Sequence, residues 1–388
     1  MDTGCNKITT ISLIIIVVLA MAGWGKIAEG KSSYSSKNIR IIKQNGARVD
    51  WSHVLNLIAF DKEGKDGYFD LYLMNPDGSN TKCLTCNKAG LPNRHMGQPA
   101  WHPSGEYIVF QAEEPLYNGH RVFSSPGWGI GNNLWVITKD GTKYWKLTHV
   151  SPERGVLHPH FSPDGQKLVW SEIISGKCGG REQKRQKLKG WDSARFWADR
   201  DWVLKVADVV WRDGVPALEN ITQYKPGRAV TGLRESHSFS PDGEKVLFSS
   251  WYDHGKWWAP DIYSLELSTG KAQRLTFSEK YWDEHAHFSP DGKKIVWITQ
   301  KWVKEKPGDI GNELSIMNAD GTEKKRLTYF NIPGSNGYTG YRTICGDSSW
   351  GPGGKRIVFF RILAGKKNPK SITFPKRTTE IILLEFEN

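Results

Sequence analysis

The segment that decides the fold is HPHFSPDG, which runs from His158 to Gly165. Similar segments recur along the chain, each with an aromatic residue at its fourth position. They lie at Arg48–Leu55, Gln98–Gly105, Ser236–Gly243, His285–Gly292 and Asp347–Gly354. Regular recurrence of one short segment is typical of proteins built from copies of a single supersecondary unit. The sequence therefore predicts six structural repeats.

Each repeat predicts a β-hairpin. The central aromatics are Trp51, Trp101, Phe161, Phe239, Phe288 and Trp350, and nine residues later stand Phe60, Phe110, Trp170, Phe248, Trp297 and Phe359. In the Pro-Asp-Gly turn, proline presets φ, aspartate tolerates the next position and glycine takes the left-handed conformation. Two apolar residues precede each second aromatic, which indicates a strand buried on both faces.

A second hairpin is expected in every repeat but the last. Its turns lie at Asn75–Gly78, Lys139–Gly141, Arg212–Gly214, Ser268–Gly270 and Ala319–Gly321. Short apolar-Thr pairs follow: Leu84-Thr85, Leu147-Thr148, Ile221-Thr222, Leu275-Thr276 and Leu327-Thr328. Four strands per repeat make one propeller blade. We therefore predict an all-β, six-bladed β-propeller of four-stranded antiparallel blades, in which the N-terminal strand at 38–42 completes the sixth blade and closes the ring.

The N-terminus has the pattern of a targeting segment. Lys7 precedes an apolar run from Ile8 to Ala22 that ends in Ala20-Met21-Ala22. This predicts a signal peptide at 1–22, a short linker at 23–37 and the propeller at 38–388. We expect a periplasmic or secreted protein, and an uncleaved N-terminal anchor is the alternative. No later segment is apolar enough to span a membrane.

The net charge indicates the class of partner, and the cysteine content limits the role of disulfide bonds in the fold. The chain carries 53 basic and 41 acidic residues, a formal charge of +12, which favours an anionic partner. Export argues against nucleic acid. Five cysteines in 388 residues are too few for disulfide bonds to be the main source of the fold's stability. Pairing among Cys83, Cys86, Cys178 and Cys345 stays open, with a local Cys83–Cys86 bond and a Cys178–Cys345 bond both considered.

The FSPDG repeats resemble those of TolB-type propellers over about residues 38–388. This resemblance implies an exported propeller. The chain shows no complete catalytic signature, and the connections at one end of the ring are long. We therefore expect binding of an envelope protein or anionic polysaccharide through that face, with no cofactor. The residues named for this binding are Trp257, Trp258, Trp302, Arg234 and Arg342, and the basic stretch 177–189 adds charge. Packing of the tryptophans within the loops is the alternative.

Histidines are the best candidates for chemistry. They precede three of the central aromatics and comprise His158, His160, His237, His285 and His287. The i, i+2 spacing of the two pairs puts both imidazoles on one side of a strand. We expect them at the mouth of the central channel, at the entry ends of the innermost strands. His158, His160, His285 and His287 could hold a transition metal, with Glu235, Glu284 and Asp283 as nearby carboxylates. A purely structural role is the alternative.

A weaker resemblance connects the histidines with oligogalacturonate lyases, which are propellers with FSPDG-like hairpins. His285 and His287 match the H-x-H element of that family, whereas Trp282 stands where its glutamine is expected. The resemblance implies a metal-dependent lyase or hydrolase that acts on uronate-containing polysaccharide and uses manganese or zinc. A basic side chain would remove a proton next to the uronate carboxylate. The catalytic residue itself is not assigned.

Overall fold

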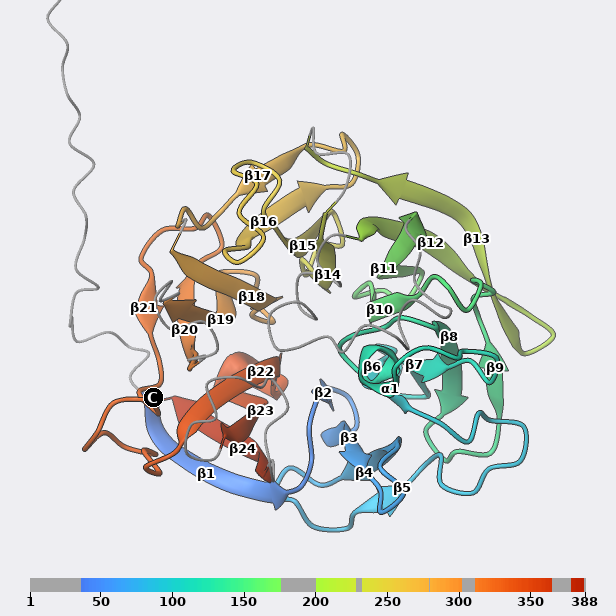
Figure 1. Ribbon diagram of the computed structural model, residues 1–388, viewed down its shortest axis with the longest axis horizontal. Coiled ribbons are helices and arrows are strands. Elements are labelled where there is room, and N and C mark those ends of the chain that lie inside the picture. Colours follow the sequence, from blue (N-terminus) through green and yellow to red (C-terminus); the bar gives the residue numbers. More distant parts are fainter. Residues whose placement is uncertain are drawn as a thin grey trace, which may run out of the picture.

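Six four-stranded antiparallel sheets form a closed ring around a central axis (Figure 1). The computed structural model describes residues 36–175, 200–227, 232–278, 280–301, 311–364 and 378–386. The expected signal peptide, Cys178, stretch 177–189 and Trp302 lie outside these ranges. The six-bladed propeller is confirmed.

The six blades follow one another along the chain. Blade 1 contains β2 (Val49–Ser52), β3 (Leu57–Glu63), β4 (Phe69–Met74) and β5 (Lys82–Cys83). Blade 2 contains β6 (Met96–Trp101), β7 (Tyr107–Glu113), β8 (Asn132–Thr138) and β9 (Tyr144–Lys146). Blade 3 contains β10 (Val156–Phe161), β11 (Lys167–Ser175), β12 (Asp201–Arg212) and β13 (Val215–Tyr224). The first strand of each blade lies nearest the axis (Figure 1).

The second half of the ring repeats this order until the last blade. Blade 4 contains β14 (Arg234–Phe239), β15 (Lys245–Ser250), β16 (Asp261–Glu266) and β17 (Ala272–Arg274). Blade 5 contains β18 (Tyr281–Phe288), β19 (Lys294–Lys301), β20 (Glu313–Asn318) and β21 (Lys325–Arg326). Blade 6 contains β22 (Arg342–Trp350), β23 (Arg356–Ala364), β24 (Thr378–Phe386) and, at its outer edge, β1 (Ser36–Gln44).

The N-terminal strand closes the ring, as the sequence predicts. β1 pairs with β24 in antiparallel register, with Ile39 opposite Leu384 and Ile41 opposite Ile382. Ile39 packs against the apolar cluster that joins blades 5 and 6. Because β1 completes blade 6, the two ends of the folded chain are tied together by a single sheet.

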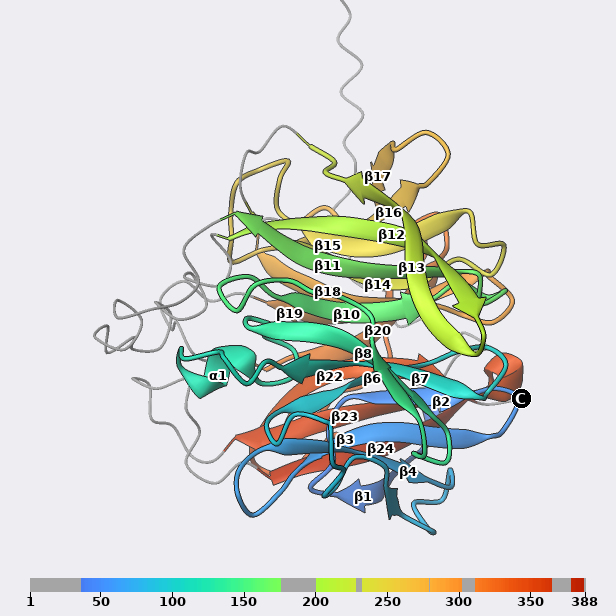
Figure 2. The same ribbon diagram turned by 90° about the vertical axis from the view of Figure 1, so that its right-hand side faces the viewer.

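Helix is scarce in the ring. α1 (Arg121–Ser124) belongs to the connection between β7 and β8, and the 3₁₀ helix η1 (Pro352–Gly354) forms the blade 6 turn. Figure 2 shows α1 at the opposite end of the ring from the tip of the β12–β13 hairpin. In the part of the chain that the structure describes, no helix combines the length and the apolar character that a membrane crossing requires.

The Leu-Thr pairs have a structural reason that their sequence does not reveal. Thr85 Oγ1 accepts a hydrogen bond from the Leu71 backbone N–H (3.0 Å) and donates one to Asp70 Oδ1 (2.7 Å). The same pair of hydrogen bonds, one accepted and one donated, is made by Thr148, Thr276 and Thr328 in blades 2, 4 and 5. Each threonine thus ties the outer strand to the start of the third strand.

Blade 3 departs from this pattern. Ile221 is 52% exposed, and Thr222 pairs with Val206 within the long β12–β13 hairpin. Thr222 Oγ1 bonds only to the Asn220 carbonyl among the described residues. The prediction that Ile221-Thr222 is equivalent to the other pairs is therefore wrong, because the lengthened hairpin places it at a different point of the blade.

Cysteine pairing is local. Cys83 and Cys86 form a disulfide, with Cα atoms 5.8 Å apart. Cys345 is a buried free thiol in β22, and burial raises its pKa well above the usual value. The disulfide encloses only a short loop, so it contributes little to the closure of the ring.

Candidate functional site

Two stacked rings of side chains lie along the axis, because each innermost strand contributes alternate residues to it. One ring stands three residues before the central aromatics and consists of Arg48, Gln98, His158, Ser236, His285 and Asp347. The other stands one residue before them and consists of Asp50, Ala100, His160, Ser238, His287 and Ser349. The first ring is rich in charge, so it is the candidate site.

The backbone is distorted where this ring forms. Gln98, His158 and His285 have φ values of 54°, 50° and 53°, in the left-handed region that residues other than glycine seldom adopt. Each stands at a register shift between the first and second strands of its blade. A bulge of this kind redirects a side chain away from the regular alternation of the strand, and such strain is common at functional sites.

Three imidazoles converge at the centre. The ring centroids of His158 and His285 lie 5.1 Å apart, and that of His237 lies 5.8 Å from each. One ring nitrogen from each of the three lies within 4.8 Å of those of the others, a spacing that allows them to share one metal ion. His158 and His237 are buried, whereas the His285 side chain is 13% exposed.

Carboxylates surround these imidazoles. Glu235 Oε1 lies 2.6 Å from His158 Nε2, and Asp347 Oδ1 lies 2.7 Å from His285 Nδ1. Glu284 Oε2 lies 3.5 Å from His285 Nε2. Carboxylates in such contacts fix the orientation of imidazole rings that bind metal.

Electrostatics separates the histidines into two kinds. Burial lowers the pKa of His158 to about 3 and holds that of His237 well below its usual range. Burial also disfavours the charged form of His285, but Asp347 and Glu284 outweigh it and raise its pKa to about 10. Without metal, the cluster therefore holds one imidazolium next to two neutral imidazoles at pH 7.

Three buried atoms of the cluster lack a regular hydrogen bond within the described ranges: His237 Nδ1, Glu235 Oε2 and His285 Nδ1. His285 Nδ1 still has an ion-pair contact with Asp347 (2.7 Å), whereas His237 bonds only through Nε2, to Ser249 Oγ (2.7 Å). Buried polar atoms rarely remain unsatisfied. A divalent cation held by the three imidazoles would account for the unpaired nitrogen, so the residues present fit a transition metal.

His160 and His287 belong to the other ring. Their centroids lie 5.2 Å apart, and His287 lies 6.4 Å from His237. They line an axial cavity of about 470 Å³ walled by the central aromatics and the prolines of the FSPDG turns. The structure thus places them at the turn end of the channel, not at the long-loop mouth where we expected them. Metal binding by His158, His160, His285 and His287 together stays a prediction.

Residues that the histidine pattern did not reveal support the first ring. Asp61 Oδ2 accepts the Gln98 backbone N–H (2.9 Å), and Asp61 pairs with Arg48 at 3.3 Å. Burial raises the pKa of Asp61 to about 6. Gln98 Nε2 lies 2.8 Å from both ring nitrogens of His158. Arg48 occupies the same repeat position as His158, so the alignment of the six segments already placed it in this ring, although only histidines were chosen as candidates.

The tryptophans of the long-loop face pack mainly into the protein. Trp251 is buried, and Trp128 and Trp257 pack half-buried against the apolar cluster that contains it. Trp258 is also half-buried, with its ring edge-on to Trp257 at 6.0 Å. Loop packing, the alternative named above, therefore accounts for Trp128, Trp251 and Trp257.

The two arginines named for binding have different surroundings. Arg234 is fully buried, and its guanidinium donates to the carbonyls of Pro226 (2.9 Å) and Trp202 (3.3 Å). Its place in the interior excludes the surface contact with a ligand that we expected, because backbone carbonyls take its donors. Arg342 is half-buried at the start of β22.

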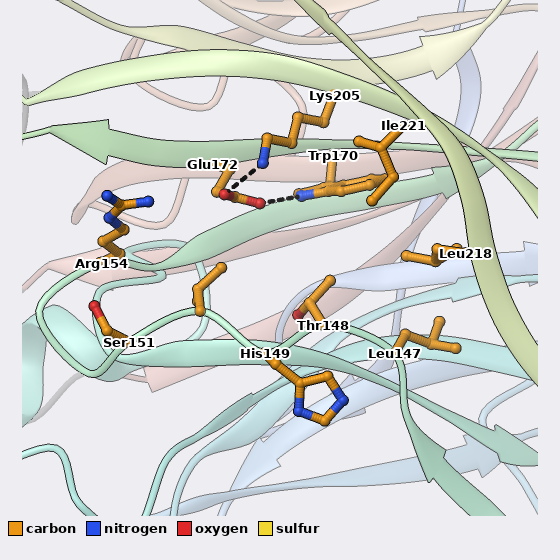
Figure 3. A pocket seen from close by; sticks show the side chains of 11 residues that line it. Leu147, Thr148, His149, Ser151, Arg154, Trp170, Glu172, Lys205, Leu218 and Ile221 are labelled. Atoms are coloured by element: carbon orange, nitrogen blue, oxygen red, sulfur yellow. Dashed lines mark hydrogen bonds and ion pairs between the residues drawn. The ribbon is translucent and has the colours of Figure 1, made fainter.

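A second recess, of about 510 Å³, lies between blades 2 and 3 (Figure 3). Glu172 accepts hydrogen bonds from Trp170 Nε1 (3.1 Å) and Lys205 Nζ (2.6 Å). The charges of Glu172 and Lys205 neutralise each other. The remaining lining is mixed, with the apolar Leu147 and Leu218 beside the charged Arg154. The recess contains none of the five axial histidines, so the axis remains the better candidate.

Comparisons with known proteins agree with the fold. No family model matches the chain. Dipeptidyl-peptidase 5 of Porphyromonas gingivalis is 25% identical over 248 residues, which cover 60% of this chain and 33% of that protein. The Tol-Pal system protein TolB of Francisella tularensis is 34% identical over 91 residues, 24% of this chain and 19% of that one. The chain spans about a third of the length of the dipeptidyl-peptidase relatives that it matches.

Solved structures give the same result. TolB from Acinetobacter baumannii superimposes with a TM-score of 0.50 and 15% identity, covering 90% of this chain and 65% of that one. Oligogalacturonate lyase from Vibrio parahaemolyticus has a TM-score of 0.48 and 12% identity, covering 91% and 95%. The chain is thus a six-bladed β-propeller whose fold is similar to that of TolB from Acinetobacter baumannii.

Proposed function

We propose that the axial cluster of His158, His237 and His285 binds a divalent transition metal, and that the protein is a metal-dependent lyase or hydrolase of uronate-containing polysaccharide. The observation that carries the proposal is the convergence of three imidazoles, with the ring nitrogens within 4.8 Å and His237 Nδ1 unpaired. Manganese and zinc are the candidates, since imidazoles beside carboxylates suit both.

Each residue of the cluster has a distinct task in this proposal. His158, His237 and His285 hold the ion, which supplies positive charge to a uronate carboxylate. Glu235 and Asp347 orient two of the imidazoles through contacts of 2.6 and 2.7 Å. Burial and the Glu235 carboxylate raise the pKa of Glu284 well above its usual value. A carboxyl group whose pKa is raised in this way suits a general acid.

Substrate access in this proposal runs along the axis. His285, Glu284 and Asp347 are the least buried members of the cluster, with side chains 13%, 12% and 11% exposed. The neutral imidazoles of His160 and His287 line the cavity at the turn end, because burial lowers the pKa of His160 to about 4 and that of His287 well below its usual range. A neutral imidazole is the form that can accept a proton.

The deciding experiment is metal analysis of the purified protein followed by activity assays. After supplementation with Mn²⁺ or Zn²⁺ and removal of excess ion, we expect about one bound metal per chain. The loaded protein should release unsaturated or reducing ends from polygalacturonate, and a chelator should stop the reaction. If the protein retained no metal, the proposal would be wrong. If the metal-loaded protein were inactive on all uronate polymers, the proposed catalytic activity would be wrong.

Metal binding should release a proton at pH 7. His158 and His237 are already neutral there, whereas His285, with a pKa of about 10, is protonated and must lose its proton to become a ligand. We expect about one proton per metal, and an affinity that rises about tenfold per pH unit between pH 6 and 9. Calorimetry in two buffers with different ionisation heats measures the number of protons released per bound metal. A value near zero would contradict the assignment of His285 as protonated.

A second candidate is a binding protein of the TolB kind. It would be exported to the periplasm and would bind an envelope protein or anionic polysaccharide through its long-loop face, without a cofactor. The stretch 34% identical to a Tol-Pal system protein and the charge of +12 favour it. Envelope pull-downs and a glycan array test it, with Trp258→Ala as the surface variant, since Trp257 packs inside. If that variant kept every partner that the unaltered protein captures, the proposed face would be wrong.

A further inference from the structure

A second set of metal-ligating atoms lies at the outer rim of blade 1, away from the axis. Cys83 ends β5, Cys86 follows it in the next turn, and Asp70 stands near the start of β4. Their sulfur and carboxylate atoms lie within 4.8 Å of one another, and all three residues are half-buried. The two cysteines are joined as a disulfide. The site therefore offers two sulfur ligands and one oxygen ligand once that bond is opened.

Comparison with blade 4 shows what is unusual here. There the equivalent carboxylate, Asp261, is paired with Arg274 at 2.5 Å and with His254 at 3.1 Å. Arg274 stands opposite Tyr263 as Cys83 stands opposite Tyr72, so the cysteine occupies the position of the arginine. In blade 1, the Asp70 carboxylate therefore has a cysteine sulfur where the Asp261 carboxylate of blade 4 has an arginine. Lys62 stands opposite Asp70 in the sheet and its amine lies 5.5 Å from the Tyr72 ring. One ammonium balances only one of the three negative charges that two thiolates and Asp70 would carry, and a bound cation would balance the others.

One local contact favours the thiolate form of Cys83. The Cys86 backbone N–H donates to Cys83 Sγ at 3.0 Å. A hydrogen bond donated to a sulfur stabilises its negative charge, and the thiolate is the form that binds metal. Cys-x-x-Cys spacing is also half of a common zinc-binding pattern.

The third proposed ligand, the Asp70 carboxylate, is held in place by a hydrogen bond. Thr85 Oγ1 donates to Asp70 Oδ1 at 2.7 Å, and Thr85 itself is fixed because it accepts the Leu71 N–H. The carboxylate is therefore oriented by a residue that the fold requires for another reason. A ligand supported in this way loses little freedom when it binds a metal.

We propose that reduction of the Cys83–Cys86 disulfide creates a binding site for a thiophilic divalent metal such as Zn²⁺, with Cys83, Cys86 and Asp70 as ligands. A dithiol reductant donates two electrons and two protons, the S–S bond breaks, and the dithiol becomes a disulfide. The metal then displaces the two thiol protons and forms two metal–sulfur bonds. The fourth tetrahedral position is left for water or a further ligand. This site is independent of the axial cluster and of the function proposed for it.

Co²⁺ is the probe for the test, because its thiolate charge-transfer band reports sulfur ligands. The full protein carries His237→Gln, which weakens the axial site, and is titrated before and after treatment with a dithiol. We expect the band only after reduction, saturating at about one Co²⁺ per chain. Zn²⁺ should then abolish the band by displacing Co²⁺. Asp70→Asn should weaken binding about tenfold or more.

The double variant Cys83→Ser/Cys86→Ser is the matched control and should show no band in either state. Circular dichroism establishes that each variant is folded. Counting reactive thiols establishes that the disulfide has opened. If the two thiols react but no band forms, the metal site does not exist. A disulfide that the dithiol cannot open in the folded protein would equally overturn the proposal, since the site depends on reduction.

Discussion

Replacement of His237 by glutamine should lower metal affinity by about 100-fold or more, because losing a ligand costs at least as much as losing a residue that supports one. The variant preserves much of the buried volume and can still bond to Ser249, the partner of His237 Nε2. The chain should therefore fold as before while one of the three imidazoles is gone. Isothermal titration with Mn²⁺ and Zn²⁺, together with the activity assay, measures the effect.

The matched control is His149→Gln, which removes an exposed imidazole far from the axis and should leave metal affinity unchanged. Thermal unfolding separates lost binding from lost structure. His237→Ala is the harsher variant, since it leaves a cavity and an unpaired Ser249 hydroxyl. If the glutamine variant folded normally and bound metal as tightly as the unaltered protein, the axial cluster would not be the metal site.

Removal of β1 should destabilise the ring more than any single substitution on its surface. A protein that begins at residue 45 lacks the outer strand of blade 6, so β24 presents a free edge and loses the partners of Ile382 and Leu384. We expect its unfolding free energy to fall by about 4 kcal/mol or more, a large share of the stability of a typical domain. Urea unfolding measures the loss, and the free edge should promote association at high concentration.

A protein that begins at residue 36 retains β1 and is the control. A synthetic peptide of residues 36–44 should bind the shortened protein and restore much of its stability, whereas a scrambled peptide of the same composition should not. Equal stability of the two proteins would show that β1 is not required to hold blade 6 closed. Failure of the peptide to bind would show that the paired register of β1 and β24 contributes little by itself.

The sequence predicted the fold well because the repeat encodes local physics. Phe110 and Phe248 stand at a fixed offset from a turn whose proline and glycine permit few conformations, and both are fully buried as expected. The closing strand was also predictable, since one blade lacked its fourth strand. The Ile221-Thr222 assignment failed because the length of a hairpin depends on tertiary packing that a short motif does not contain.

The site was predicted less completely. Sequence spacing placed His158 and His285 on innermost strands, and these residues meet at the axis. His237 was among the candidate histidines, but the regular alternation of a strand gave no reason to add it to the four predicted metal ligands, and it nevertheless reaches the cluster. The burial of Arg234 could not be predicted either. An arginine next to a loop is expected at the surface, and only the structure shows the backbone carbonyls that accept its hydrogen bonds.

The pairing of β1 with β24 also has a consequence for how the molecule reaches its native state. Ile39 and Leu384 are hundreds of positions apart, so this is among the most non-local contacts in the chain. Such contacts form slowly, since the intervening polymer must already be compact before its ends can meet. β1 therefore cannot complete its pairing until β24 has been synthesised, and a chaperone that binds the nascent chain would have β1 to shield during that interval.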